Sequence, residues 1–318
     1  RYHALVRPAL LTALLGYTFV GIGLSADLGR YYSIWHPMIY WQGNSVLFEV
    51  GICVMSYMTV LYLEFLPIVA ERFKDGVHFP GLLRVFDGLA TRLLRVTDKT
   101  LSRILSFFII MGVVLSCLHQ SSLGTLMVIA PTKIHPLWYT PIMPLLFWLS
   151  AVAVGFPMVI FEGLWAAHSF KLKPEMDLLS PLARFIPFFL GLYAAAKLID
   201  LAERDMLTSV FSFGPASLAF CLEFGLGVLL PLALLLSRRV RETPSYLFFA
   251  VLLIVLGVAL NRVNVFITAY TPPFTTHSYW PSVGEWLVTA ALIATLVLCY
   301  RFVVLNFPVI SGHAKNRS

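Results

Sequence analysis

The chain has 318 residues, of which 59% are hydrophobic and 12% are charged, and its mean hydropathy is +0.83. Soluble domains carry about 25% charged residues, roughly twice this share. The formal net charge is +7. This composition excludes a cytosolic enzyme, a secreted disulfide scaffold and a disordered protein, because none of these classes could hide so much apolar surface from water. Lipid must be the solvent for most of the chain.

Eight apolar stretches are long enough to cross a bilayer core, which takes about 20 helical residues. Helices are favoured over barrel strands because the runs are long and evenly apolar, whereas barrel strands alternate over about ten residues. We therefore expect an all-α integral membrane protein, with residues 1–318 forming a single polytopic domain. The expected spans are 8–26, 46–70, 104–129, 141–167, 181–201, 210–236, 246–268 and 286–308.

The basic residues predict the orientation. If the first residues are cytoplasmic, sixteen Lys and Arg fall on the cytoplasmic side, and four (Arg30, Lys133, Arg204 and Arg262) fall on the opposite side. Positive charge is enriched in cytoplasmic loops, so both ends of the chain should be cytoplasmic. Residues 71–103 form the long basic cytoplasmic loop of this topology. Its apolar residues at helical spacing (Leu82, Leu83, Phe86 and Leu89) could form a helix lying along the headgroups.

The loops on the opposite side are rich in tyrosine and tryptophan, among them Trp138 in 130–140 and Trp280 in 269–285. Aromatic residues concentrate at membrane–water interfaces, so these side chains indicate an aromatic belt. They are also compatible with a docking surface for a partner protein.

Several polar residues lie in or beside the outer halves of the first two spans, where lipid makes them costly. Asp27 and Arg30 are three residues apart and could form an ion pair at the end of the first helix. Asn44 or Ser45 could cap the second helix, and Glu49 follows one turn later, near the positive end of the helix dipole.

The third span carries the consecutive polar residues His119, Gln120, Ser121 and Ser122 towards its outer end, and His135 follows in the next loop. A single histidine in a membrane core is often only a satisfied polar residue, and His135 could equally be a surface residue. Four consecutive polar side chains inside a span are harder to explain by packing alone.

Three further carboxylates, Glu64, Glu162 and Glu223, lie deeper in the membrane. They could be steps of a proton path, or carboxylic acids that burial keeps protonated and that join helices by hydrogen bonds. Lys197 and Asp200, three residues apart in the fifth span, are predicted to form an internal ion pair.

The outer polar residues could converge on one pocket, because consecutive antiparallel helices with short loops tend to be neighbours. Such a pocket would be polar at its mouth and apolar below, which suits a quinone. Oxidation of a quinol releases two protons, so a carboxylate or an imidazole must lie within hydrogen-bond reach. The residues concerned are Asp27, Arg30, Asn44, Glu49, His119, Gln120, Ser121 and His135.

Four segments carry a family resemblance: Asn44–Glu49 (NSVLFE), His119–Gly124 (HQSSLG), His135–Trp138 (HPLW) and Ile160–Gly163 (IFEG). They resemble the NrfD-like quinone-interacting membrane subunits, in particular the HybB type found with periplasmic nickel–iron hydrogenases. The resemblance implies paired four-helix bundles in a ten-helix protein, so the first two helices of that pattern would be missing here. It makes Asp27, Glu49 and His119 the candidates for quinone and proton handling, with Gln120 and Arg30 in support.

The resemblance also implies a subunit of the bacterial inner membrane that contains no catalytic metal. It would pass electrons between a ferredoxin-like iron–sulfur protein, on the periplasmic side with the catalytic subunits, and menaquinone or ubiquinone. Some relatives are b-type cytochromes, but bis-histidine ligation needs two histidines at similar depth, and only His119 lies within a predicted span. We therefore expect no haem. The four cysteines show no metal-ligand spacing, so no metal site is expected.

Two other functions fit the composition. A secondary transporter would show inverted repeats and helices broken near the midplane. The only sign of an internal repeat is the His-Pro pair at 36–37 and again at 135–136, which is weak. A purely structural anchor would use the buried polar residues for packing alone.

Overall fold

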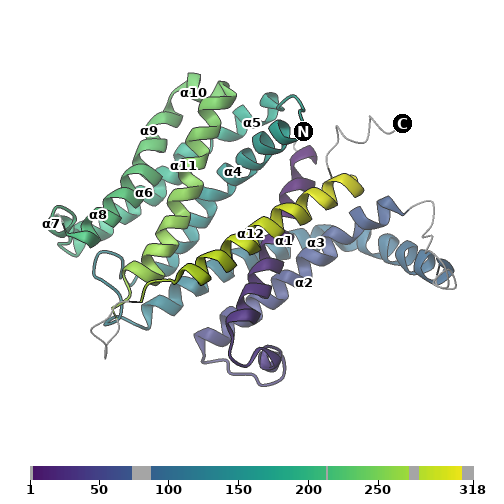
Figure 1. Ribbon diagram of the computed structural model, residues 1–318, viewed down its shortest axis with the longest axis horizontal. Helices are drawn as coiled ribbons and strands as arrows, with labels where there is room; N and C mark the ends of the chain where they lie inside the picture. Colours follow the sequence, from purple (N-terminus) through teal and green to yellow (C-terminus); the bar gives the residue numbers. More distant parts are fainter. Residues whose placement is uncertain (1–2, 74–86, 213, 272–278, 310–318) are drawn as a thin grey trace. The chain divides into compact units, whose positions relative to one another are not determined.

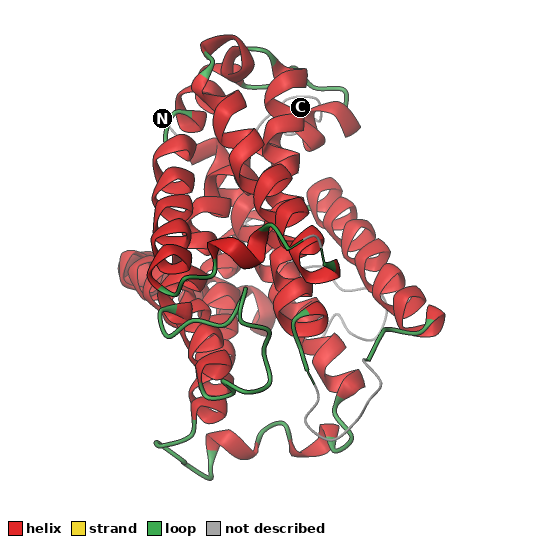
Figure 2. Ribbon diagram, turned by 90° about the vertical axis from the view of Figure 1, so that its left-hand side faces the viewer, coloured by secondary structure: helices red, strands yellow, loops and turns green. Residues whose placement is uncertain are grey.

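The computed structural model describes residues 3–73, 87–212, 214–271 and 279–309, without the side chains of 3, 4, 87 and 89–103. Over these ranges the regular structure is entirely helical (Figure 2). The one isolated β-bridge in the described residues joins Ile134 to Tyr270. The sequence prediction of an all-α fold is confirmed.

Eight helical spans within the described residues are long and apolar enough to cross a membrane, as the sequence predicts. Their ends lie within five residues of the expected positions. The first four are α1 (His3–Asp27, with its apolar part from Leu5), α2 (Val46–Arg72), the Ile104–Val128 part of α3 (Asp87–Val128), and α4 (Met143–Ser169). The others are α5–α6 (Met176–Ala183 and Ile186–Glu203), α8–η4–α9 (Pro215–Cys221, Leu222–Leu229 and Leu230–Leu236), α11–η5 (Pro244–Val263 and Asn264–Thr268), and α12 (Val283–Asn306).

Short helices lie between the spans. The connection after α1 contains the 3₁₀ turns η1 (Tyr31–Ser33) and η2 (His36–Met38), and α7 (Leu207–Val210) and α10 (Arg238–Glu242) flank the sixth span. Ser45 caps α2 by accepting a hydrogen bond from the Phe48 amide at 3.3 Å, which confirms one of the two predicted caps.

Helix α3 is longer than expected. It begins at Asp87 and runs for 42 residues, so the second half of the predicted 71–103 loop is helical and continuous with the third span. The predicted interfacial residues Leu82, Leu83 and Phe86 lie outside the described residues, and the side chain of Leu89 is not described.

The chain divides into two compact units, one of Tyr2–Ser116 with Ser282–Ser318 and one that is essentially Cys117–Pro281. In the first unit, α1 packs on α2 and α12. Arg7 in α1 ties their ends together: its guanidinium bonds to the Glu71 carboxylate at 2.6 Å and to the Pro308 carbonyl at 2.7 Å.

The second unit is a ring of four spans (Figure 1). Helix α4 packs on α6 and α11, the α8–η4–α9 span packs on α11, and α6 packs on α9 to close the ring. We call the end of this bundle that carries loop 129–142 the loop end, and the opposite end, with α5 and α10, the α10 end.

Two segments of this bundle, η4 and η5, are π-helical. Such segments are rare and occur frequently at functional sites. The backbones of η4 and α11 touch where they cross, because a Cβ atom added to Gly227 would lie 2.5 Å from the Gly257 Cα. Small residues allow this close approach of membrane helices.

Replacing Gly257 by alanine should therefore force η4 and α11 apart. Overpacking of this kind typically costs about 1–3 kcal/mol, so the detergent-solubilised protein should unfold at a lower temperature. Gly225→Ala, two residues from Gly227, is the matched control because nothing lies within 4 Å of its added Cβ. Equal melting temperatures for the two variants would contradict the described crossing.

Candidate functional site

A buried polar cluster inside the second unit is built around Glu223, in π-helix η4, which is 2% exposed. Three N–H donors converge on its carboxyl group: Trp138 Nε1 at 2.8 Å, Asn261 Nδ2 at 2.6 Å and Asn264 Nδ2 at 2.8 Å. The donors come from loop 129–142, α11 and η5. The group is therefore held as a hydrogen-bond acceptor that joins three parts of the bundle.

Two cations lie beside this acceptor. Arg262 donates to Asn261 Oδ1 and to Ser150 Oγ, both at 2.9 Å, and its guanidinium carbon lies 3.8 Å from the Phe147 ring centroid. Lys197 Nζ lies 5.3 Å from the centroid of the Phe220 ring. Glu223 interacts electrostatically with both Lys197 and Arg262, so the carboxyl group and the two basic side chains form one cluster inside the bundle.

A small cavity of about 10 Å³ adjoins Tyr193, Lys197 and Asn261. This volume is close to what one water molecule needs, and the lining offers several polar groups to bind it. The cluster therefore has space for a single water molecule beside Lys197.

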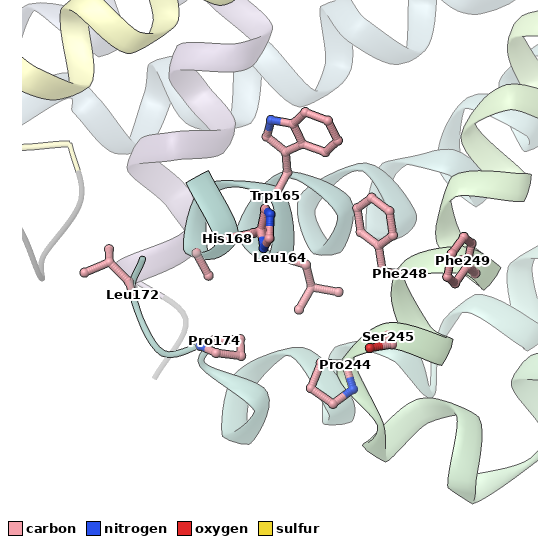
Figure 3. A pocket seen from close by; sticks show the side chains of 10 residues that line it. Leu164, Trp165, His168, Leu172, Pro174, Pro244, Ser245, Phe248 and Phe249 are labelled. Carbon is pink, nitrogen blue, oxygen red and sulfur yellow. The ribbon is translucent and has the colours of Figure 1, made fainter. Parts of the chain in front are cut away.

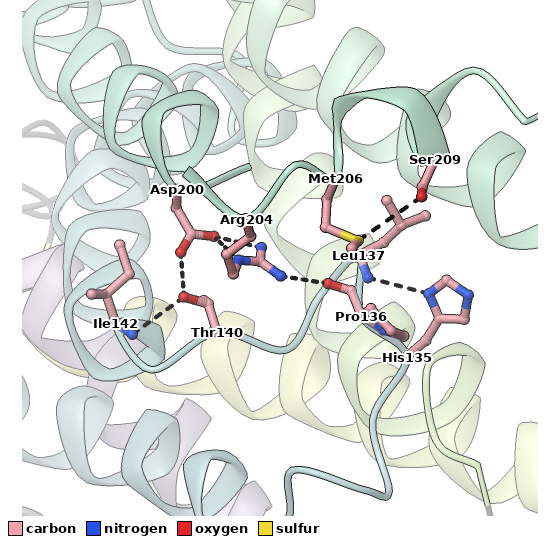
Figure 4. Close-up of polar contacts among 9 residues, drawn as sticks. All are labelled: His135, Pro136, Leu137, Thr140, Ile142, Asp200, Arg204, Met206 and Ser209. Atoms are coloured by element: carbon pink, nitrogen blue, oxygen red, sulfur yellow. Dashed lines mark hydrogen bonds and ion pairs between the residues drawn. The ribbon is translucent and has the colours of Figure 1, made fainter. Parts of the chain in front are cut away.

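A second set of polar contacts closes the loop end of the bundle (Figure 4). The Asp200 carboxylate accepts hydrogen bonds from Arg204, at 2.6 and 3.1 Å, and from the Thr140 hydroxyl. Arg204 also donates to the Pro136 carbonyl oxygen at 2.7 Å. These contacts fix loop 129–142 across the ends of α6 and α4.

Three sequence interpretations are wrong here. Asp200 forms its ion pair with Arg204, one turn along α6, instead of with Lys197. Trp138 is 1% exposed and bonded to Glu223, so it belongs to the core and not to an aromatic belt. Arg262, grouped with the outer-side charges, lies within the seventh span and is bound there.

His135 lies in loop 129–142 and is half-buried. Its backbone amide donates to the Ala269 carbonyl at 2.8 Å, and its Nδ1 accepts a hydrogen bond from the Leu137 amide at 3.2 Å. Burial lowers the pKa of His135 below its ordinary value of 6.5. The imidazole therefore stays neutral, and able to accept this hydrogen bond, to a lower pH than an exposed histidine would.

His119, Gln120 and Ser121 lie in α3, in the part of that helix that belongs to the second unit. His119 is 8% exposed, and nine residues, or about 14 Å of helix, separate it from the end of α3 at Val128. Close packing fixes α3 against α4 one turn further on, since a Cβ on Gly124 would collide with Pro144.

The other outer residues belong to the first unit. Asp27 ends α1, Arg30 lies in the turn that follows, and Asn44 and Glu49 flank the start of α2. All four side chains are exposed, and within the described residues no ion pair joins Asp27 to Arg30. Because α1 packs on α2, these residues gather at one end of that helix pair.

The deeper carboxylates have different surroundings. In the first unit, Glu64 Oε1 is buried without a hydrogen-bond partner among the described residues, and it lies 2.9 Å from the position of a Cβ added to Gly112. In the second unit, Glu162 is 9% exposed in α4, seven residues from the α10 end. Glu223 lies eight residues from the start of α8 at the loop end.

A separate pocket of about 510 Å³ opens at the α10 end, between α4 and α11 (Figure 3). Its lining is mostly apolar and aromatic, including Trp165, Phe248 and Phe249, with His168 and Ser245 as its polar side chains. The rings of Trp165 and Phe248 stack with centroids 6.2 Å apart. None of the candidate site residues predicted from the sequence lines this pocket.

The chain is similar in sequence to a known family of membrane proteins. Residues 2–273 match the family described as "Polysulphide reductase, NrfD". The chain belongs to the NrfD family. It is thus a multi-pass membrane protein of that family, as the sequence resemblance indicates.

Individual relatives agree with this assignment. A protein of Nitratidesulfovibrio vulgaris is 36% identical, over 98% of this chain and 78% of its own length. The "Probable Ni/Fe-hydrogenase 2 b-type cytochrome subunit" of Escherichia coli is 32% identical, over 99% of this chain and 76% of its own length. The "Menaquinone reductase, integral membrane subunit" of N. vulgaris is 23% identical, over 94% of this chain and 74% of its own length.

Proposed function

We propose that this chain is the quinone-reactive membrane subunit of a respiratory oxidoreductase. It passes electrons between a periplasmic iron–sulfur protein and menaquinone or ubiquinone in the bilayer. Family membership over residues 2–273 is the observation that carries the proposal. It is supported by relatives whose names are a menaquinone reductase membrane subunit and a hydrogenase 2 subunit, because both names describe parts of larger redox complexes.

The chemistry of quinol oxidation suggests a role for each candidate residue predicted from the sequence. A quinol that gives up two electrons also gives up two protons, which require nearby bases. His119, Asp27 and Glu49 are our candidates for these bases. Gln120 and Arg30 would donate hydrogen bonds to the quinone oxygens, and Asn44, Ser121 and His135 would support them. This assignment rests on the sequence motifs and on the burial of His119.

The orientation follows from charge. With Arg262 left out as part of the seventh span, sixteen basic residues against three favour cytoplasmic chain ends. The loop end of the second unit and the α1–α2 connection would then be periplasmic. Catalytic and iron–sulfur subunits would dock there, and the exposed aromatic residues Tyr40, Trp41 and Trp280 offer contact area.

An inward proton route is part of the proposal, with Glu223, Glu162 and Glu64 as its carboxylates. The cluster around Glu223 supports it, since a carboxyl group, a lysine and a water-sized cavity lie together there. Glu223 lies about 12 Å from the loop end and Glu162 about 10 Å from the α10 end, so water would have to bridge them.

The name of the E. coli relative includes a b-type cytochrome, but the histidines of the described spans do not fit bis-histidine ligation of haem. The described spans contain two histidines, His119 and His168. Helices α3 and α4 run in opposite directions, and Gly124 of α3 lies against Pro144 of α4. His119, five residues before Gly124, therefore lies level with about residue 149 of α4. This level is some 28 Å along α4 from His168. The two cannot be axial ligands of one haem, which bind iron from opposite faces of one macrocycle.

His119→Ala tests the quinone assignment in the assembled complex. Loss of the imidazole should lower quinone turnover by about 10²-fold or more, which is the usual contribution of a general base. His168→Ala is the matched control, because His168 lines the separate pocket at the α10 end. The assignment fails if His119→Ala retains normal turnover and quinone affinity, and it is reversed if only His168→Ala loses activity.

Glu223→Gln tests the proton route in oriented vesicles that contain the assembled complex. The substitution nearly preserves volume but removes the ionisable group, so electron transfer to quinone should continue while fewer protons cross per electron. Glu175→Gln, an exposed residue before α5, is the control. An unchanged ratio of protons to electrons in Glu223→Gln would rule out Glu223 as a step of the route.

A further inference from the structure

A pocket of about 330 Å³ at the α10 end of the second unit is lined almost entirely by polar side chains. Its lining comes from α5, from the junction of α5 with α6, and from α10, which packs on α5. The residues that line it are Ser180, Arg184, Arg238, Arg241 and Glu242.

The pocket has an excess of positive charge. Glu242 is its single carboxylate, and it is paired with Arg238 at 2.7 Å. Arg241 donates to the Leu235 carbonyl at 3.0 Å, and no carboxylate among the described residues forms an ion pair with it. The described part of the structure gives the Arg184 guanidinium no ion-pair or hydrogen-bond partner. Two of the three cations are thus available to an anion.

The pocket lies near the α10 ends of two spans. Arg184 lies at the junction of α5 and α6 in the fifth span, and Arg238 lies two residues beyond Leu236, the last residue of the sixth span. Next to these cations, large apolar side chains point outward: Phe185 is 52% exposed, Phe188 67% and Leu236 66%. Phe188 is one helical turn from Arg184, so a cation and a lipid-facing ring lie on the same side of the helix start.

We infer that this pocket binds the phosphate group of an anionic phospholipid, with the acyl chains lying over Phe185, Phe188 and Leu236. Arginine forks match phosphate oxygens in pairs, which gives strong and directional hydrogen bonds. Basic pockets between membrane helices are suited to such headgroups. A free phosphate would use the same arginines but would gain nothing from the apolar side chains beside them.

The test uses the full chain in detergent, with phosphatidylglycerol or phosphatidylcholine added and the bound lipid counted by native mass spectrometry. The unmodified protein should bind phosphatidylglycerol in preference to phosphatidylcholine. Arg184→Gln should weaken the binding of phosphatidylglycerol by about tenfold, as expected for loss of a hydrogen bond to a charged group. Arg239→Gln is the matched control: it removes an exposed arginine of α10 that does not line the pocket.

Two outcomes would overturn the inference. Equal phosphatidylglycerol binding by Arg184→Gln and Arg239→Gln would show that this pocket is not the site. Full displacement of the lipid by millimolar inorganic phosphate would show a site for free anions. Should Arg184→Gln fail to fold, Arg184→Lys keeps the charge but loses the paired geometry, and a smaller loss of lipid binding is expected of it.

Discussion

Lipid cannot hydrogen-bond a polar group, so every polar group within a span needs a partner from the chain, a bound water or a ligand. Glu223 shows how the second unit meets this constraint. Its carboxyl group accepts hydrogen bonds from Trp138, Asn261 and Asn264, which come from three segments far apart in sequence. Leaving one buried donor without this acceptor would cost about 1–3 kcal/mol, so the bundle ring and the polar cluster depend on each other.

The same constraint explains why two segments of the bundle, η4 and η5, are π-helical instead of α-helical. Glu223 and Asn264 both lie in π-helical segments and hydrogen-bond to each other at 2.8 Å. The close crossing of Gly227 and Gly257 holds η4 against α11, the helix that continues into η5. Loop 129–142 then covers this region, and the Asp200–Arg204 pair fastens it. This polar interior on irregular helices, closed at one end, is the feature that supports the proposed proton route.

The sequence predicts much of this fold because the strongest signal, the length of each apolar run, can be read directly along the chain. Runs of about 20 apolar residues define the spans, and their ends agree with the structure to within five residues. The partners of Glu223 were missed because depth along a helix does not reveal which faces meet. The run Asn261-Arg262-Val263-Asn264 inside the seventh span was an available signal: three polar residues in four, at membrane depth. Trp138 was misread for a related reason, since a tryptophan in a loop can fold back into the core.

The central proposal is that His119, Asp27 and Glu49 handle the quinone and its protons. Photolabelling the assembled complex with an azido-quinone, followed by peptide mapping, tests it most directly. If the proposal is right, peptides that contain 24–49 and 117–124 carry the label, and an excess of unlabelled quinone reduces it. Competed label confined to 164–174 and 244–249, which line the pocket at the α10 end, would contradict it.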